Sequence, residues 1–301
     1  MQVILSGLAI GAVYGLVGMG FSIAFYVTRV INFAEGQLLM VAIMLTAALA
    51  RGGVPALPAA LIGIGGSAVA GVLVYVIAVR PVLAFSRFSF AWLVSTLGVA
   101  LVLENLAAII WGPTSRAFPA LLKNSSVHIG SAHVTVQEVV GFFIALALAA
   151  AFELARRRTA FGRLGVAIAE DPEMASAVGA NTQAFAIAAF AIAGVFAGVA
   201  GVLIGPLTFA NPYLGDTYGI SGFVALMIGV TRRPLSAMGG GLLLGLLSQL
   251  ATSAINSQAA DWLPFVVVVL VLLLTPDGLF SLRLRRPAAL QRTHTAGVAA
   301  P

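Results

Sequence analysis

The sequence predicts an all-α membrane protein, a polytopic bundle of transmembrane helices. Of the 301 residues, 60% are hydrophobic and only 9% are charged, whereas soluble globular chains are about 25% charged. Apolar segments of about 20 residues, the length that a helix needs to cross a hydrocarbon core of about 30 Å, recur along the chain. So few charges cannot cover a water-facing surface, and we expect the lipid membrane to surround most of the chain.

Eight segments are long and apolar enough to be membrane spans. A ninth, 219–230, is apolar but short, and is either a tilted span or a re-entrant segment buried within the bundle. The first segment is preceded by neither a basic region nor a small-residue cleavage site, which indicates a retained span and not a signal peptide. The eight segments are 3–27, 31–50, 57–79, 90–111, 138–155, 185–207, 237–256 and 262–276.

Arginine residues orient the predicted bundle, because cytoplasmic loops carry an excess of Lys and Arg. Four alternate loops are basic, whereas the opposite loops hold only Arg51, Arg116 and Lys123. This alternation requires 219–230 to cross, so we predict nine spans, with the N-terminus outside and the C-terminus in the cytoplasm. The net charge of +6 then reflects topology and does not indicate a nucleic-acid partner. The basic loops contain Arg80 with Arg87, Arg156 to Arg158 with Arg163, Arg232 with Arg233, and Arg283 with Arg285 and Arg286.

The chain is accordingly predicted to form a single transmembrane domain, 1–301, with two polar extensions. One is a charged cytoplasmic loop at 156–184, and the other is a basic cytoplasmic tail at 281–301. The loop is the one sizeable charged interruption of the apolar chain, so it is the first place to look for function. The sequence contains no cysteine, which excludes disulfides, thiolate metal sites and cysteine nucleophiles.

Glycines line one face of the first span and one face of the span at 185–207. Their spacings of three and four residues place each set on a single helix side, where small residues let helix backbones approach closely in lipid. Tight packing is the favoured interpretation, and a moving helix interface is the alternative. The two sets are Gly7, Gly11, Gly15 and Gly18, and Gly194, Gly198, Gly201 and Gly205.

The predicted outside loop ends in a segment, 127–136, whose apolar and polar residues partly alternate about Gly130-Ser131. This pattern predicts a short hairpin that caps the bundle. The hairpin segment contains His128 and His133, but two histidines without a further ligand make a weak metal site. We therefore predict no metal centre.

The charged loop contains strong signals for a short helix. Asp171 suits the N-cap, Pro172 the first helical position, Glu173 the positive end of the helix dipole, and Gly179 the position after the C-cap. The sequence therefore predicts a two-turn helix, 172–178, that lies outside the lipid.

This short helix has an apolar face. Met174, Ala177 and Val178 are spaced at i, i+3 and i+4, which places them on one side of the helix. A helix of two turns is marginal by itself. It must therefore pack on the bundle's own cytoplasmic surface or dock into a groove on a partner protein.

The segment Glu173-Met-Ala-Ser-Ala-Val-Gly179 resembles the EAA loop of ABC importer permeases, with Met174 in place of the first alanine. Further stretches resemble the membrane subunits for branched-chain amino acids. This chain departs from the family at two positions. Relatives often have His or Gln at position 35 and an acid at position 37, whereas this chain has Glu35 and Gln37. The resemblance therefore transfers no role to Glu35. The similar stretches are Val30-Ile-Asn-Phe-Ala-Glu-Gly36, Arg80-Pro81 with Ser95-Thr-Leu-Gly98, Thr159 to Gly179, Ala197-Gly-Val-Ala-Gly201 and Pro276-Asp-Gly-Leu-Phe280.

The resemblance implies an ABC importer permease fold in a bacterial inner membrane. It implies two ATPase subunits, a second homologous permease and an external substrate-binding protein as partners, with ATP and Mg²⁺ used by the ATPase. Branched-chain amino acids are the expected substrates; urea, short amides or another small polar solute are the alternative. In the family, a helix of the EAA loop inserts into a cleft on the ATPase. The residues of this loop here are Gly162, Arg163, Glu170, Asp171, Pro172, Glu173, Met174, Ala175, Ala177, Val178 and Gly179.

Motifs for catalysis are missing from the sequence. The glycine-rich segment 239–245 lacks the lysine and hydroxyl with which a phosphate loop holds phosphate and Mg²⁺. Neither a G-x-S-x-G elbow nor an H-E-x-x-H helix is present. We therefore expect no enzymatic activity and no bound cofactor in this chain, with ATP hydrolysis on a separate partner.

Two acids, Glu35 and Glu104, lie at bilayer depth in the predicted spans, where a charge costs about 2.5 to 3.5 kcal/mol or more and usually faces a cavity or a partner. They are either lining residues of a passage or structural polar contacts. An ion-coupled secondary transporter would use such an acid, for example Glu104, as its coupling site, but it would not need a docking helix. A passive channel would need a ring of filter residues, which is not obvious. The candidate passage residues are Asn32, Glu35, Ser95, Thr96, Glu104 and Asn105.

Overall fold

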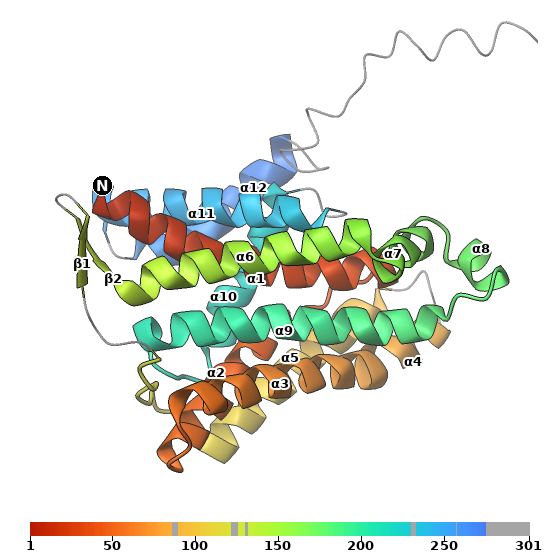
Figure 1. Ribbon diagram of the computed structural model, residues 1–301, viewed down its shortest axis with the longest axis horizontal. Coiled ribbons are helices and arrows are strands. Elements are labelled where there is room, and N and C mark those ends of the chain that lie inside the picture. The colour runs from red at the N-terminus through yellow and green to blue at the C-terminus, as the bar shows by residue number, and fades with distance from the viewer. Residues whose placement is uncertain (86–89, 122–125, 130–131, 230–232, 257, 275–301) are drawn as a thin grey trace, which may run out of the picture.

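The computed structural model describes residues 1–301 except 86–89, 122–125, 130–131, 230–232, 257 and 275–301. Long helices run side by side along the longest axis and form one bundle (Figure 1). The polytopic all-helical class is confirmed. The elements are α1 (Gln2–Thr28), α2 (Glu35–Arg51), α3 (Ala56–Val74), the π-helical turn η1 (Tyr75–Val79), α4 (Arg80–Phe85), α5 (Ala91–Trp111), β1 (Ser126–Ile129), β2 (Ala132–Thr135), α6 (Val136–Arg158), α7 (Ala160–Glu170), α8 (Pro172–Ala177), α9 (Thr182–Thr208), α10 (Leu214–Ile228), α11 (Pro234–Ala254) and α12 (Ala259–Leu274).

Every predicted span contains a helix, although the helices differ in length. Within the described residues, six helices are long and apolar enough to cross a membrane. The helices α2, α10 and α12 have 17, 15 and 16 residues. The nine-span topology therefore stays a prediction, with these three helices as the short crossings.

Helix α1 lies at the centre of the bundle and packs against α11 through glycines. A Cβ atom added at Gly241 would lie 2.2 Å from the Gly15 nitrogen, and one added at Gly245 would lie 2.3 Å from the Gly11 Cα. Real Cβ contacts are not this short, so the two backbones touch where glycine alone fits. The predicted close packing of the first glycine face is confirmed.

The second glycine face, on α9, packs against two other helices. An added Cβ at Gly194 would lie 2.5 Å from the Ser67 carbonyl oxygen on α3, and one at Gly201 would lie 2.6 Å from the Leu39 carbonyl oxygen on α2. The Ser67 hydroxyl lies 2.8 Å from the Leu38 carbonyl oxygen and 2.7 Å from that of Gly194. Helices α2, α3 and α9 are thus joined at one buried polar contact.

Three of the four predicted basic loops meet at one end of the bundle. Arg156 and Arg233 line a common cleft, and Arg80 lies beside Gln183, whose amide oxygen can accept from its guanidinium at 3.0 Å. The N-terminus and the β1–β2 hairpin lie at the opposite end (Figure 1). This arrangement agrees with the predicted alternation. Arg87, Arg232 and the fourth basic loop lie outside the described residues, as does the tail at 281–301.

The predicted hairpin is confirmed as the antiparallel pair β1–β2, in which His128 and His133 are register partners. Thr135 then caps α6: its hydroxyl accepts from the Glu138 amide at 3.3 Å, and the Glu138 carboxylate accepts from the Thr135 amide at 3.0 Å. This reciprocal capping box fixes the start of α6 directly after the hairpin. Among the described residues, no group of three potential metal ligands occurs.

Candidate functional site

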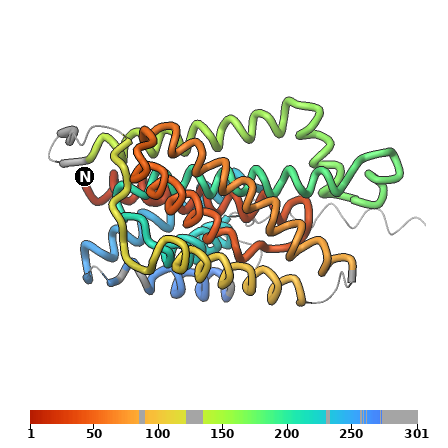
Figure 2. The backbone as a smooth tube through the Cα atoms, turned by 90° about the horizontal axis from the view of Figure 1, so that it is seen from below, coloured from red at the N-terminus to blue at the C-terminus, as the bar shows by residue number. Residues whose placement is uncertain are grey.

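Helices α7 and α8 form an arm, Ala160–Ala177, that extends from the end of the bundle opposite the N-terminus (Figure 2). A sharp corner connects it to α6. The Thr159 hydroxyl accepts from the Gly162 amide at 3.0 Å and caps α7. A Cβ atom at Gly162 would lie 2.2 Å from the Arg156 carbonyl oxygen. The corner can therefore be this tight because residue 162 has no side chain.

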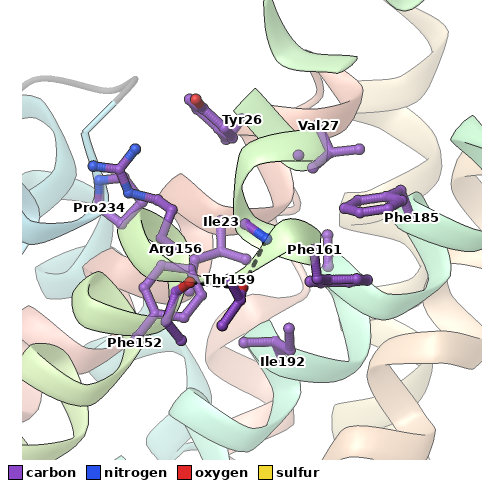
Figure 3. A pocket seen from close by; sticks show the side chains of 14 residues that line it. Ile23, Tyr26, Val27, Phe152, Arg156, Thr159, Phe161, Phe185, Ile192 and Pro234 are labelled. Atoms are coloured by element: carbon purple, nitrogen blue, oxygen red, sulfur yellow. Dashed lines mark hydrogen bonds between the residues drawn. The ribbon is translucent and has the colours of Figure 1, made fainter. Parts of the chain in front are cut away.

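Helix α7 was not predicted as a separate helix, and its packing fixes the arm to the bundle. Its Phe161 ring stacks on Phe185 of α9, with ring centroids 4.2 Å apart (Figure 3). Ile168 is buried in a small cluster with Phe185. At the end of α7, the Ala169 carbonyl accepts a hydrogen bond from Arg29, directly after α1. The arm is thus joined to both central helices of the bundle, α1 and α9.

Helix α8 has the predicted capping and ends within one residue of the predicted helix. The Asp171 Oδ1 atom accepts from the Glu173 amide at 3.0 Å and from the Met174 amide at 2.9 Å. Pro172 occupies the first turn. Gly179 has a φ of +93°, the left-handed conformation expected after the C-cap.

The predicted apolar face of α8 is exposed. Met174 is 65% and Val178 79% exposed, and Ala177 and Glu173 are exposed beside them. The opposite side presents Ala175, which is 4% exposed and packs in the cluster with Ile168. The helix therefore packs on the bundle through its Ala175 side, whereas the described part of the chain leaves the predicted apolar face uncovered.

The remaining predicted loop residues lie around the corner. Arg163 is exposed, and its guanidinium lies 3.4 Å from the Arg158 carbonyl oxygen. Glu170 is exposed and lines the basic cleft. Within the cleft, the Glu153 carboxylate accepts from Arg156 at 2.7 Å and also from Arg157. These contacts pair the buried Glu153 carboxylate with two arginines at the base of the arm.

An apolar cavity of about 130 Å³ lies under the corner, between α1, α6, α7 and α9 (Figure 3). This cavity is partly open to the outside, so the arm rests on apolar surface that the described part of the chain does not fill. The described residues that line it are Ile23, Tyr26, Val27, Phe152, Ala155, Arg156, Thr159, Phe161, Gly162, Gly165, Phe185, Ala189, Ile192 and Pro234.

A second cavity, of about 320 Å³, lies between α1, α2, α5 and α10 and is open on one side, where Leu97, Leu101 and Asp216 are exposed. Three of its lining residues are polar and lie together, whereas the others are apolar or glycine. The lining residues are Phe21, Phe33, Gln37, Leu97, Ala100, Leu101, Glu104, Gly215, Asp216, Gly219, Ile220 and Phe223. We call it the membrane cavity.

The polar end of the membrane cavity is organised by Gln37. Its amide nitrogen donates to the Asp216 carboxylate at 2.9 Å and lies 3.3 Å from a Glu104 carboxylate oxygen. The Gln37 side chain is buried, with the residue 2% exposed, and its amide oxygen accepts from no described residue. The cavity therefore has two carboxylates and one vacant amide oxygen at the same end.

The apolar end is an aromatic wall made by Phe21, Phe33 and Phe223. The Phe223 ring lies 6.1 Å from the Phe21 ring and 5.6 Å from the Phe33 ring, measured between centroids. Such a wall offers contact to an apolar side chain and excludes water from it. The membrane cavity can thus hold a small molecule with one cationic end and one apolar end.

Of the six predicted passage residues, only Glu104 lines this cavity. Asn32 and Glu35 are fully buried elsewhere, where the Asn32 amide donates to Glu35 Oε2 at 3.2 Å. The other Glu35 oxygen has no hydrogen-bond partner in the described structure. A Cβ at Gly20 would lie 2.1 Å from that oxygen, so the carboxyl group is closely packed against α1.

The hydroxyl and amide candidates on α5 all donate to backbone carbonyls, Ser95 to the turn η1 and the other two to their own helix. The Ser95 hydroxyl donates to the Ala78 carbonyl at 2.9 Å, and Thr96 donates to the Trp92 carbonyl at 3.0 Å. The Asn105 amide donates to the Leu101 carbonyl of its own helix at 2.8 Å, and the residue is exposed. None of these three side chains is among the residues that line the membrane cavity.

Sequence reasoning missed Gln37 and Asp216 as cavity residues. Gln37 is a polar residue within the segment 31–50, and Asp216 lies just before the short segment 219–230. Both were visible as polar interruptions of apolar sequence, which is the signal that identified Glu104. Their convergence on Glu104 was not visible.

Comparisons with known proteins agree with the sequence resemblance. The family model described as "Branched-chain amino acid transport system / permease component" matches residues 3–275. The chain is similar to the high-affinity branched-chain amino acid transport system permease protein LivH of Escherichia coli K12, with 31% identity over 93% of this chain and 95% of that protein. It is also similar to the corresponding protein BraD of Pseudomonas aeruginosa, with 27% identity over 93% and 95%.

Proposed function

Because the chain belongs to the family of permease components of branched-chain amino acid transport systems, we propose that it is the membrane-spanning subunit of an ATP-driven importer of branched-chain amino acids. The observation that carries this proposal is the exposed apolar face of α8, with Met174 65% and Val178 79% exposed. An exposed helix face of this kind fits a groove on a partner. The partner is a separate ATPase subunit, which binds ATP and Mg²⁺.

The arm transmits force between that ATPase and the bundle. When ATP closes the two ATPase subunits, the groove that holds α8 moves, and α8 moves with it. Arg29 and Phe185 join the arm to α1 and α9, so the movement reaches the central helices. Repeated inward and outward opening of the bundle then gives alternating access to the passage.

The assembly has four further parts by this proposal. A second homologous permease completes the passage, two ATPases face the arm, and an external binding protein delivers the solute. The arm end of the bundle lies in the cytoplasm and the hairpin end outside a bacterial inner membrane, with the C-terminus in the cytoplasm. Clustering of Arg80, Arg156 and Arg233 at the arm end supports this orientation.

The test uses the complete transporter reconstituted in liposomes with its ATPase and binding protein. Glu173→Lys reverses the charge beside the apolar face, and Val178→Asp makes that face polar. We expect either change to reduce amino-acid uptake and ATPase stimulation by about 5- to 150-fold, the range of typical coupling free energies. Copurification of the ATPase with the permease measures docking directly.

Ser176→Ala is the matched control, because this exposed hydroxyl donates to the Glu173 carbonyl of its own helix at 2.8 Å and lies outside the apolar face. Its uptake and ATPase stimulation should equal those of the wild type. If Glu173→Lys and Val178→Asp also left both quantities unchanged, α8 would not be the docking element.

A further inference from the structure

The polar end of the membrane cavity has an excess of negative charge. Glu104 and Asp216 both bind the amide nitrogen of Gln37. Among the described residues that line the cavity, none is Lys, Arg or His. Two carboxylates that share one neutral donor repel each other. A cationic group between them would remove this repulsion.

The Gln37 side chain supplies an independent reason to expect a ligand with donors. Its amide oxygen is buried and accepts from no described residue, although a buried polar group without a partner costs about 1 to 3 kcal/mol. The nitrogen of the same amide is bound to two carboxylates, so rotating the amide by 180° would place oxygen against oxygen. The orientation is therefore fixed, and the vacant acceptor lies against Gly215 of the cavity wall, where an added Cβ would be 2.2 Å away.

The three acceptors match an ammonium group. A primary ammonium has three N–H donors and no acceptor, and Glu104, Asp216 and the Gln37 oxygen offer one acceptor group each. A divalent metal ion would require more ligands than two carboxylates and one amide oxygen, and the rest of the cavity supplies carbon. The polar end is thus better suited to an organic cation than to a metal.

The apolar end of the cavity determines which side chain a ligand with an ammonium group can have. The aromatic wall around Phe223, together with Leu97 and Ile220, presents carbon atoms to the ligand. Its volume of about 320 Å³ is at the lower end of the range of about 300 to 1,000 Å³ for small-molecule pockets. The cavity is therefore suited to a short aliphatic or aromatic chain.

We propose that Gln37, Glu104 and Asp216 bind the α-ammonium group of an amino acid as it passes through the permease, while the Phe223 wall holds its aliphatic side chain. This inference rests on the proposed import function and adds a binding site inside the membrane. It restricts the expected substrates to solutes that carry an ammonium group. Urea and short amides, which are neutral, would leave the two carboxylates unpaired.

The experiment removes the charges without changing the shape of the side chains. The complete wild-type transporter and the double variant Glu104→Gln, Asp216→Asn are reconstituted with the ATPase and a binding protein loaded with radiolabelled leucine. Uptake of leucine by the double variant should fall at least about tenfold, because charged hydrogen bonds are lost. ATPase stimulation by the loaded binding protein should stay within about twofold, because the arm is unchanged and coupling is intact.

Glu138→Gln is the matched control, since it makes the same chemical change at a partly exposed acid of α6 outside the membrane cavity, and glutamine also serves in a capping box. Its uptake should equal that of the wild type. If the double variant assembles poorly by size exclusion, the single variants Glu104→Gln and Asp216→Asn carry the same test.

The outcomes separate the two proposals. Leucine uptake by an assembled variant within twofold of the wild type would overturn the ammonium site and leave the importer proposal standing. A wild-type complex that imports only neutral solutes would overturn both the substrate of the proposed function and the ammonium site. Loss of uptake with retained ATPase stimulation supports the site.

Discussion

The arm and the membrane cavity are built by contacts of different range. In the arm, Asp171 caps α8 through amides two and three residues further along the chain, and Thr159 caps α7 in the same way. At the polar end of the cavity, Gln37 binds residues that are 67 and 179 positions away. The helix starts of the arm are therefore set locally, although Arg29 and Phe185 fix its position on the bundle. The polar end of the cavity exists only once α2, α5 and α10 have packed together.

Because the two regions are built differently, mutations in them should impair different steps of transport. A change in the arm should uncouple the ATPase from a bundle that is still folded. A change at the cavity should impair passage while the ATPase still responds. A change in the packing of the bundle should remove both.

The largest effect is expected from Gly241→Ala, which breaks the packing on which both regions depend. The added Cβ would lie 2.2 Å from the Gly15 nitrogen, and overpacking costs about 1 to 3 kcal/mol, occasionally more. The unfolding temperature of the detergent-solubilised protein and its monodisperse fraction in size exclusion should both fall.

Gly65→Ala on α3 is the control for this variant, since nothing lies within 4 Å of its added Cβ. It should be neutral or stabilising, by up to about 1 kcal/mol, because alanine favours helix more than glycine. Equal destabilisation by the two changes would show that the α1–α11 approach is not what limits stability.

The next effect concerns the corner of the arm. In Gly162→Ala, the Cβ would lie 2.2 Å from the Arg156 carbonyl oxygen, so α7 must swing away from α6. We expect uptake to fall about 5- to 150-fold, as for a lost coupling contact, with the unfolding temperature of the bundle nearly unchanged. A large drop in that temperature would mean that the corner is part of the bundle's core and that the two regions are not separable.

A smaller effect is expected when the cap of α8 is removed. Asp171→Ala removes the acceptor for the Glu173 and Met174 amides, which costs about 1 kcal/mol. This corresponds to amide hydrogen exchange about fivefold faster in α8. Asp171→Asn keeps an acceptor and should restore slow exchange, and failure of this rescue would assign the effect to charge instead of capping.

The same difference in range explains what the sequence could predict. Helix α8 was predicted because Asp171, Pro172 and Gly179 act on their own neighbours. Helix α7 was missed although Phe161, Leu164 and Ile168 are spaced as one helix face. It begins directly after the end of α6, where Arg156 to Arg158 had been interpreted as a topology signal alone.

The membrane cavity could be predicted only in part, because helix packing decides which polar residues meet. Glu35 and Gln37 are two residues apart, and successive residues of an α-helix are rotated by about 100°. The two side chains therefore point in nearly opposite directions: Glu35 is buried beside Asn32, whereas Gln37 faces the cavity. Without the positions of α5 and α10, no pattern in the sequence distinguishes them.

The smallest effect is expected at Asn105, the neighbour of Glu104 on α5. Both residues were candidates from sequence, but the Asn105 amide donates to the Leu101 carbonyl of its own helix and is exposed. Asn105→Ala should therefore leave leucine uptake by the reconstituted transporter within about twofold of the wild type, since exposed side chains away from a site contribute within about 0.5 kcal/mol. Glu104→Gln, measured in parallel, should reduce uptake at least tenfold by the ammonium proposal. If the two neighbours had equal effects, the passage would run along the outer face of α5 and not through the membrane cavity.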